Sequence, residues 1–298
     1  MKLGRLIIHG VLVVYLLGTL FALVVGARFD LIRFLFVYGI LFTGTLSAMY
    51  NNNYNDVEID RYATQTLFSG GSRILVDHPE LMKSVKRLSV FFLSVSILFG
   101  LVGMLLFAFP LTFFLLIVFG NLLAWFYTAP PIQLIYHGLG GFGTMIAAGF
   151  IVPGLGYFSS KGQIDIMFLP LLIPLLFHGF ALSFYLEIPD QDADRRGHKN
   201  TLVVRWGTRV GLLIAAMFSL LATVSFFLYG IFKVSSGAIN YWIVALFSCI
   251  PLFVSFYSLI RYRVNTKKIT TLVFSSATSF ILFFLLFISY LIVIIVRS

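Results

Sequence analysis

Nine long apolar runs divide this sequence, and they limit the possible folds more than any other feature. A helix needs about 20 apolar residues to cross the ~30 Å hydrocarbon core of a bilayer, and the runs are close to that length. The sequence therefore predicts an all-α, polytopic membrane protein with nine transmembrane helices and a single domain, residues 1–298. The runs are 3–27, 31–54, 88–109, 111–127, 138–158, 166–188, 210–232, 239–260 and 269–296.

A soluble globular domain is excluded by composition, because 60% of the residues are hydrophobic and only 11% are charged. A membrane β-barrel would show short segments of alternating polarity, and the sequence does not contain them. The first run, from Leu6 to Ala27, is too long for the apolar core of a signal peptide and lacks a clear cleavage site, so we expect it to be retained. The single cysteine, Cys249, excludes a disulfide framework and a thiolate metal site.

Lysine and arginine residues lie mostly on one side of the predicted membrane. If the N-terminus is placed on side one, sixteen of the 21 basic residues fall on that side. Cytoplasmic loops are enriched in basic residues, so we expect the cytoplasmic membrane, with the N-terminus inside and the C-terminus outside. The same placement argues against a nucleic-acid partner. The sixteen residues are Lys2, Arg5, Arg61, Arg73, Lys83, Lys86, Arg87, Arg195, Arg196, Lys199, Arg205, Arg209, Arg261, Arg263, Lys267 and Lys268.

Nine of the eleven acidic residues lie in two loops on that same side. Each loop follows a long apolar run and carries two aspartates four residues apart, Asp56 and Asp60 in the first loop and Asp190 and Asp194 in the second. Residues four apart lie on one face of a helix, so Asn52 joins the first pair. Random solvated loops would not concentrate the acids in this way. The nine are Asp56, Glu58, Asp60, Asp77, Glu80, Glu187, Asp190, Asp192 and Asp194.

The two aspartate pairs indicate a metal site if the loops face each other. Carboxylates at this spacing repel one another, and a cluster of them beside the hydrocarbon is costly unless a cation binds it. Mg²⁺ takes carboxylate oxygens together with substrate phosphates, so we expect the four aspartates to bind Mg²⁺ and a phosphate-bearing substrate. Arg73, Arg195 and Lys199 are placed for direct contacts to phosphate oxygens. The alternative is two solvated acidic loops of an ordinary membrane protein.

Smaller signals surround the two loops. Pro130-Pro131 ends the fourth run, and Tyr127 just before it is placed to reach a phosphate or a substrate oxygen, although a helix stop with interfacial aromatics is the alternative. For Tyr136, later in the same segment, an interfacial position is a sufficient explanation. Pro189 should break the sixth span just before Asp190, which supports a central cavity beneath the acidic cluster.

The spaced motifs resemble those of the UbiA superfamily of intramembrane prenyltransferases. The matching residues are Asn52-x-x-x-Asp56-x-x-x-Asp60 after the second run and Asp190-x-x-x-Asp194-x-x-Gly197-x-x-x-Thr201-Leu202 after the sixth. This resemblance covers nearly the whole chain. It implies that the four aspartates bind Mg²⁺, which holds a polyprenyl diphosphate, and that ionisation gives an allylic carbocation captured by an acceptor. It also implies an apolar tunnel, open to membrane lipid, for the isoprenoid tail.

The sequence departs from the family pattern in two places. The first motif of the family commonly reads Asn-Asp-x-x-Asp-x-x-x-Asp, and here its second position is Asn53. The Tyr-x-x-x-Lys of the 4-hydroxybenzoate branch is not matched, because Pro131 follows Tyr127 at that spacing. Gly71-Ser72-Arg73 and Lys199-x-Thr201-Leu202-Val203-Val204-Arg205 are instead similar to the menaquinone (MenA-like) branch, which implies an aromatic, quinone-precursor acceptor.

The expected function is therefore Mg²⁺-dependent transfer of a prenyl group from a polyprenyl diphosphate to an aromatic acceptor. An ether-lipid synthase, a haem or chlorophyll prenylating enzyme and a terpene cyclase would use the same cluster and stay as alternatives. A cation or lipid-phosphate transporter is a further alternative, but transporters favour acids at the membrane midplane rather than at helix ends. The expected catalytic and metal-binding residues are Asp56, Asp60, Asp190 and Asp194, and the expected substrate-binding residues are Asn52, Arg73, Tyr127, Arg195 and Lys199.

Overall fold

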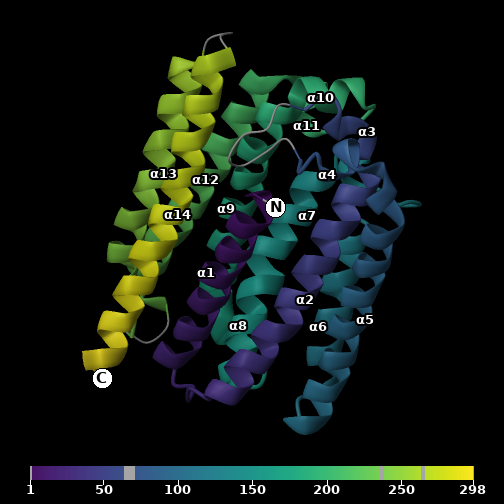
Figure 1. The fold of residues 1–298 in the computed structure, drawn as a ribbon. Helices are drawn as coiled ribbons and strands as arrows, with labels where there is room; N and C mark the ends of the chain where they lie inside the picture. The colour runs from purple at the N-terminus through teal and green to yellow at the C-terminus, as the bar shows by residue number, and fades with distance from the viewer. Residues whose placement is uncertain (1, 64–70, 235–237, 263–265, 298) are drawn as a thin grey trace.

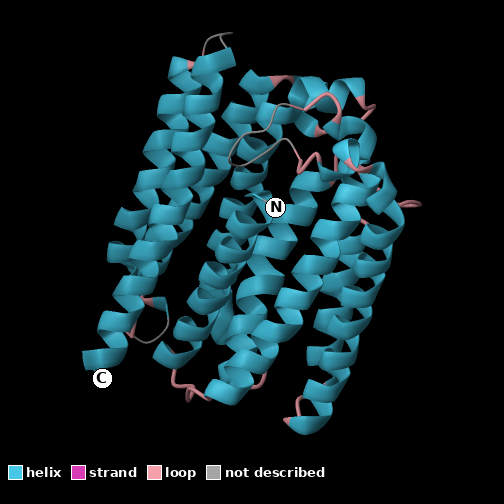
Figure 2. Cartoon of the chain, viewed as in Figure 1, coloured by secondary structure: helices cyan, strands magenta, loops and turns pink. Residues whose placement is uncertain are grey.

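A computed structural model describes residues 2–63, 71–234, 238–262 and 266–297. All regular secondary structure in these residues is helical, as Figure 2 shows. The prediction of an all-α fold is thus confirmed for the part of the chain that is described.

The long helices follow the apolar runs of the sequence closely. Several runs are covered by two or three consecutive helical segments, because short 3₁₀ or π-helical turns (η) interrupt them. The helices of these runs are α1 (Lys2–Val24), α2 (Leu31–Asn55), α5 (Met82–Leu106), α6 (Leu111–Trp125), α7 (Gly140–Ile146), η3 (Ala147–Ile151), α8 (Val152–Lys161), η4 (Ile166–Phe168), α9 (Leu169–Glu187), α12 (Thr208–Ile231), α13 (Tyr241–Arg261) and α14 (Thr266–Arg297).

Seven helical stretches within the described residues are long and apolar enough to cross a membrane. Two further apolar helices, Ile8–Val24 and Leu111–Trp125, are shorter. Seven of the nine predicted spans are therefore matched by helices that are long enough to cross a membrane. The two shorter helices belong to the first and fourth runs, in which α1 covers Lys2–Val24 and α6 covers Leu111–Trp125.

Helix boundaries coincide with capping and breaking residues. The Asp30 side chain accepts hydrogen bonds from Ile32 and Arg33 N–H and so caps the start of α2. Pro110, which separates the third and fourth apolar runs, lies in the turn between α5, which ends at Leu106, and α6, which begins at Leu111.

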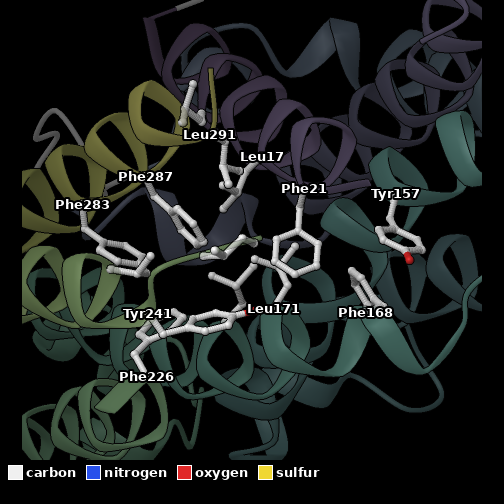
Figure 3. Close-up of a cluster of buried hydrophobic side chains, with 14 of the residues drawn as sticks. Leu17, Phe21, Tyr157, Phe168, Leu171, Phe226, Tyr241, Phe283, Phe287 and Leu291 are labelled. Atoms are coloured by element: carbon white, nitrogen blue, oxygen red, sulfur yellow. The ribbon is translucent and has the colours of Figure 1, made fainter. Parts of the chain in front are cut away.

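The long helices pack into one bundle (Figure 1). Helix α1 packs against α8 and α14, α2 against α5, and α9 against α7 and α12. The largest group of buried side chains joins α1, α9, α12, α13 and α14 (Figure 3). Phe21, Tyr157 and Phe168 lie at one end of this group, and Phe226, Phe283 and Phe287 lie at the other. Each buried aromatic side chain of this kind contributes about 1.5–3 kcal/mol relative to exposure.

Short helices gather at one end of the bundle, shown at the top of Figure 1. They carry both aspartate motifs, so the fold brings together the two loops that the sequence separates. Pro189 lies in a 3₁₀ turn that separates α9 from the next helix, which confirms the predicted break. These elements are α3 (Val57–Asp60), α4 (Ile74–Asp77), η1 (Pro79–Leu81), η2 (Leu134–His137), η5 (Ile188–Asp190), α10 (Gln191–Arg196) and α11 (Leu202–Trp206).

Candidate active site

The first motif bends at Asp56. Helix α2 ends at Asn55, and Asp56 (φ −96°, ψ 7°) precedes the single turn of α3. The expectation of one continuous helix through the motif is therefore wrong at this residue. Asn52, Asp56 and Asp60 nevertheless keep the backbone hydrogen bonds of a helix. The Asp56 N–H donates to Asn52 O and the Asp60 N–H donates to Asp56 O, each at 2.9 Å.

Lys199 lies between the two motifs. Its Nζ donates to Asp56 Oδ2 at 2.9 Å and lies 3.9 Å from Asp194 Oδ1. The side chains are little exposed, at 7% for Lys199, 16% for Asp56 and 6% for Asp194. Burial opposes the charge on Lys199, but the two carboxylates outweigh it and raise its pKa above the ordinary value. This contact confirms that the two acidic loops face each other.

Tyr136 joins the same cluster, a contact that its interpretation as an interfacial aromatic did not include. The Tyr136 hydroxyl donates to Asp56 Oδ1 at 2.8 Å, and the Lys199 ammonium lies 5.3 Å from the centre of the Tyr136 ring. The Asn200 N–H donates to Tyr136 O at 3.1 Å. Tyr136 thus contacts the first motif through its side chain and the loop after the second motif through its backbone. The sequence did contain one indication of this contact. Tyr136 lies in the same segment as Tyr127, on the side of the membrane that carries the acidic loops.

Asp60 is buried against the segment that leads into α4. It is 7% exposed, and the backbone N–H of Arg73 donates to it. Burial, followed by the charge of Asp56, raises the pKa of Asp60 to about 6. A Cβ on Gly71 would overlap the Asp60 carboxylate, so this close approach requires glycine.

Asn52 is held by a hydrogen bond from the segment after α6. The Thr128 hydroxyl donates to Asn52 Oδ1 at 2.8 Å. One residue earlier, Asn51 Nδ2 donates to Trp125 O at 2.8 Å, and Asn55 Nδ2 donates to Asn51 Oδ1 at 3.1 Å. The end of α2 is therefore tied to the end of α6 by side-chain amides, which fixes the polar face that carries Asp56.

Small side chains let the two motifs approach each other. Ile59, Ala63 and Ala193 form a buried apolar contact with Tyr136 packed against it. A Cβ on Gly197 would overlap Ile59 Cγ1. The glycine of the second motif thus allows close packing of α3 against the turn after α10.

The other expected site residues lie at different depths. Tyr127 is partly buried, with its ring against Gly143. Asp190 is partly buried and adds to the negative charge around Asp60. Arg195 is exposed, at the end of α10. The structure therefore brings Asp56, Asp60, Asp190, Asp194 and Lys199 together and leaves Arg195 at the surface.

As the side chains stand, no three His, Cys, Asp or Glu residues of the described ranges are close enough to hold a metal ion. A positive charge nevertheless lies between the carboxylates of both motifs, since the Lys199 ammonium contacts Asp56 and approaches Asp194. Oxygen ligands of this kind suit a hard divalent cation, so the donor chemistry fits Mg²⁺.

The sequence matches the model of the UbiA prenyltransferase family over residues 11–277. A curated relative is the 1,4-dihydroxy-2-naphthoate octaprenyltransferase of Bacillus subtilis, which is 23% identical over 238 residues. That alignment covers 79% of this chain and 73% of the relative.

Two solved structures share the fold over nearly their whole length. A UbiA homologue from Archaeoglobus fulgidus, bound to DMAPP and Mg²⁺, aligns with a TM-score of 0.66 and 15% identity, covering 100% of this chain and 99% of that one. A structure titled for digeranylgeranylglyceryl phosphate synthase aligns with a TM-score of 0.64 and 17% identity, covering 96% and 92%. At these identities the two structures establish the shared fold alone.

Proposed function

The chain belongs to the UbiA prenyltransferase family, and from that premise we propose that it transfers a prenyl group from a polyprenyl diphosphate to an aromatic quinone precursor. The enzyme is a transferase of alkyl groups other than methyl. The proposal concerns its substrates, its metal and the residues that act on them. It rests first on the contact of Lys199 with Asp56 and Asp194, because this contact joins both motifs in one site.

We assign the metal site to the four motif aspartates. Asp56, Asp60, Asp190 and Asp194 would hold Mg²⁺, and a homologue of this fold has been seen with DMAPP and Mg²⁺. Mg²⁺ would neutralise the diphosphate and the negative charge that grows on the leaving oxygen. Tyr136 orients Asp56 for this task through its hydroxyl.

The diphosphate would lie against the basic residues and amides around these acids. The Lys199 ammonium contacts Asp56 and approaches Asp194, and the backbone N–H of Arg73 donates to Asp60. Charge-assisted contacts to phosphate are about twice as strong as neutral ones, so both residues are assigned to the diphosphate. Asn52 and Tyr127 line the same end of the bundle, and Arg195 supplies positive charge at its exposed edge.

An aromatic acceptor is supported by the naphthoate octaprenyltransferase among the relatives. The lipophilic chain of the donor and the acceptor would both enter from membrane lipid, since exposed apolar side chains cover the long helices.

For the arrangement in the membrane we propose nine spans in one domain, residues 1–298, around a central cavity. The two shorter apolar helices, Ile8–Val24 and Leu111–Trp125, would complete the set. The distribution of Lys and Arg supports a position in the cytoplasmic membrane, with the N-terminus and the aspartate end of the bundle facing the cytoplasm.

Product analysis tests the proposed reaction. Purified protein would receive Mg²⁺, a prenyl diphosphate and a panel of acceptors that includes hydroxynaphthoates, 4-hydroxybenzoate and glycerol phosphate ethers. A prenylated aromatic product is expected, whereas a glycerol ether product would identify an ether-lipid synthase. Asp56→Asn and Asp190→Asn should abolish donor consumption, and the exposed Asp77→Asn serves as the control. If both site variants consumed donor normally, the metal assignment would be rejected and the transporter alternative favoured.

A second measurement tests the diphosphate contacts. Arg73→Ala should raise the apparent KM for the prenyl diphosphate more than the KM for the acceptor. An unchanged KM for the donor would show that Arg73 does not bind the diphosphate.

A further inference from the structure

Glu187 is a buried acid that the assigned site does not use. It is the last residue of α9, three residues before Asp190 and seven before Asp194, and it is 6% exposed. At these spacings it lies one turn deeper in the bundle than Asp190, on the same side of the chain. Its position is therefore below the acids that we assign to the metal.

One carboxylate oxygen of Glu187 is left without a partner. The backbone N–H of Val203, at the start of α11, interacts with the carboxylate. Among the described residues, no hydrogen-bond donor reaches Glu187 Oε2, which is buried. Leaving a buried polar atom without a partner destabilises the folded state, and does so more strongly when the group is charged. Such an atom calls for an explanation in terms of a ligand or a reaction.

The surroundings of Glu187 are those of the site. The charged groups that interact with it are Asp194 of α10 and Lys199 of the following loop. The Tyr127 phenol, from the segment after α6, is the third group close enough to interact with its charge. Glu187 is thus buried among the second motif, the loop that follows it and the segment after α6.

We propose that Glu187 Oε2 is the catalytic base that removes the hydroxyl proton of the aromatic acceptor. This inference rests on the proposed function. The unpartnered oxygen needs a hydrogen-bond donor, and the hydroxyl of a phenol or naphthol supplies one. Its depth places it beyond the diphosphate, on the side from which an apolar acceptor would approach the prenyl C1 atom.

The proton and electron changes balance without any further reagent. The acceptor O–H bond breaks, its proton moves to Glu187 Oε2, and the electron pair stays on the phenolate oxygen. A ring carbon of the phenolate forms the new bond to prenyl C1 while the C1–O bond breaks and its electron pair leaves with the diphosphate. The resulting neutral dienone regains its aromatic ring when the proton on the alkylated carbon moves to the ring oxygen. One proton remains on Glu187 and is released to solvent before the next turnover.

Glu187→Gln tests the role of Glu187 as a base, because it keeps the shape of the side chain and removes the carboxylate that accepts the proton. General-base catalysis contributes about 10²–10⁴-fold in rate, so prenyl transfer to a neutral phenol should fall at least 100-fold. Binding of geranyl diphosphate with Mg²⁺, measured by calorimetry, should stay within twofold of the wild type. The exposed Asp192→Asn, on the next turn, is the matched control and should leave both measurements unchanged.

An acceptor that is already ionised distinguishes loss of the base from a structural defect. Loss of the base should slow transfer to neutral phenols only, whereas a structural defect should slow transfer to both kinds of acceptor. With a nitro-substituted phenol, which is a phenolate at the assay pH, E187Q should approach the wild-type rate. Equal loss with neutral and ionised acceptors would overturn the proposal. Loss of Mg²⁺-dependent geranyl diphosphate binding would also overturn it, since Glu187 would then be a metal ligand.

Two further results distinguish a failure of this inference from a failure of folding and from a failure of the proposed function. If E187Q does not fold, Glu187→Asp retains a carboxylate and should transfer to the neutral phenol faster than Glu187→Ala does. Equal rates in these two variants would reject a base at this position. If the wild-type protein itself prenylates no aromatic acceptor, the proposed function fails. Normal transfer by E187Q refutes only the role of Glu187.

Discussion

Lys199 and Asp56 are 143 residues apart in the sequence, yet Lys199 Nζ lies 2.9 Å from Asp56 Oδ2. The same ammonium lies 3.9 Å from Asp194 Oδ1, so one side chain neutralises an acid from each motif. The two halves of the site are therefore coupled through a cation that belongs to the chain itself.

Removing this ammonium should make the fold depend on a divalent cation. Lys199→Met keeps the length of the side chain and leaves two buried carboxylates facing each other. Breaking a buried ion pair costs about 3–5 kcal/mol, so the variant should melt well below the wild type in a chelator. Mg²⁺ should recover part of the loss, because it can neutralise the same carboxylates.

Thermal unfolding in detergent, with chelator and then with Mg²⁺, checks this expectation. Lys83→Met, at an exposed position on α5, is the control. A Lys199→Met protein that melts like the control in both buffers would show that the contact with Asp56 contributes little to stability.

Tyr136→Phe should weaken the reaction while the fold stays intact. The change removes only the hydroxyl that donates to Asp56 Oδ1 at 2.8 Å, and it keeps the ring beneath Lys199. A hydrogen bond to a charged group contributes about 1.5–3 kcal/mol, so turnover should fall about 10- to 100-fold and half-saturation by Mg²⁺ should need a higher concentration. Steady-state rates over a Mg²⁺ series measure both. Tyr257→Phe, at an exposed tyrosine of α13, should change neither, and an equally small effect at Tyr136 would contradict the role in orienting Asp56.

Asp60→Asn should stabilise the metal-free protein at alkaline pH and inactivate the enzyme. Burial and Asp56 raise the pKa of Asp60 from its ordinary value of 3.8 to about 6. The folded state therefore favours the protonated acid, and this favourable contribution is complete below about pH 4 and lost as the pH rises through about 6. Asparagine avoids that loss, so the variant should gain about 1–3 kcal/mol over the wild type at pH 8 in chelator.

Melting curves from pH 5 to pH 8 in chelator check the pH dependence. The advantage of Asp60→Asn should shrink as the pH falls below about 6, and the exposed Asp77→Asn is the matched control. A constant difference across this range would mean that Asp60 does not titrate in it.

The helices of the bundle could be predicted from the sequence, because apolar length is a local property. The Phe109-Pro110 hairpin and the break at Pro189 were equally local, since proline acts on its own helix. The sequence also predicted that the two aspartate motifs would meet. It could not predict which side chains would join them.

Tyr136 and Lys199 show where the sequence was insufficient. Lys199 was assigned to phosphate from its charge, but its contact with Asp56 depends on how the loop after α10 folds back on α3. Tyr136 was interpreted from its neighbouring prolines, and its hydroxyl reaches Asp56 only because its backbone also binds Asn200. Glu187 was known as an acid near the second motif, but the missing partner of its Oε2 is a property of three-dimensional packing.

Comparing Gly71→Ala with Gly162→Ala distinguishes the effect of close packing against Asp60 from the effect of backbone strain. Gly71 and Gly162 both have a left-handed backbone, with φ of +60° and +77°. An alanine at either position should cost about 1 kcal/mol of stability because side chains disfavour this conformation. At Gly162 no atom lies within 4 Å of the added Cβ, whereas at Gly71 the Cβ would overlap the Asp60 carboxylate.

Gly71→Ala should therefore lose at least as much stability as Gly162→Ala, and the two variants should differ in activity. Asp60 must move away from Asp56 to accommodate the methyl group added at position 71, so Gly71→Ala should lose at least tenfold in turnover and require more Mg²⁺ for half-saturation. Gly162→Ala, at the end of α8, should keep its turnover within twofold of the wild type. Turnover is to be compared at matched fractions of folded protein, which melting curves provide. If Gly71→Ala kept normal turnover and Mg²⁺ dependence, the close approach of this segment to Asp60 would have no part in catalysis.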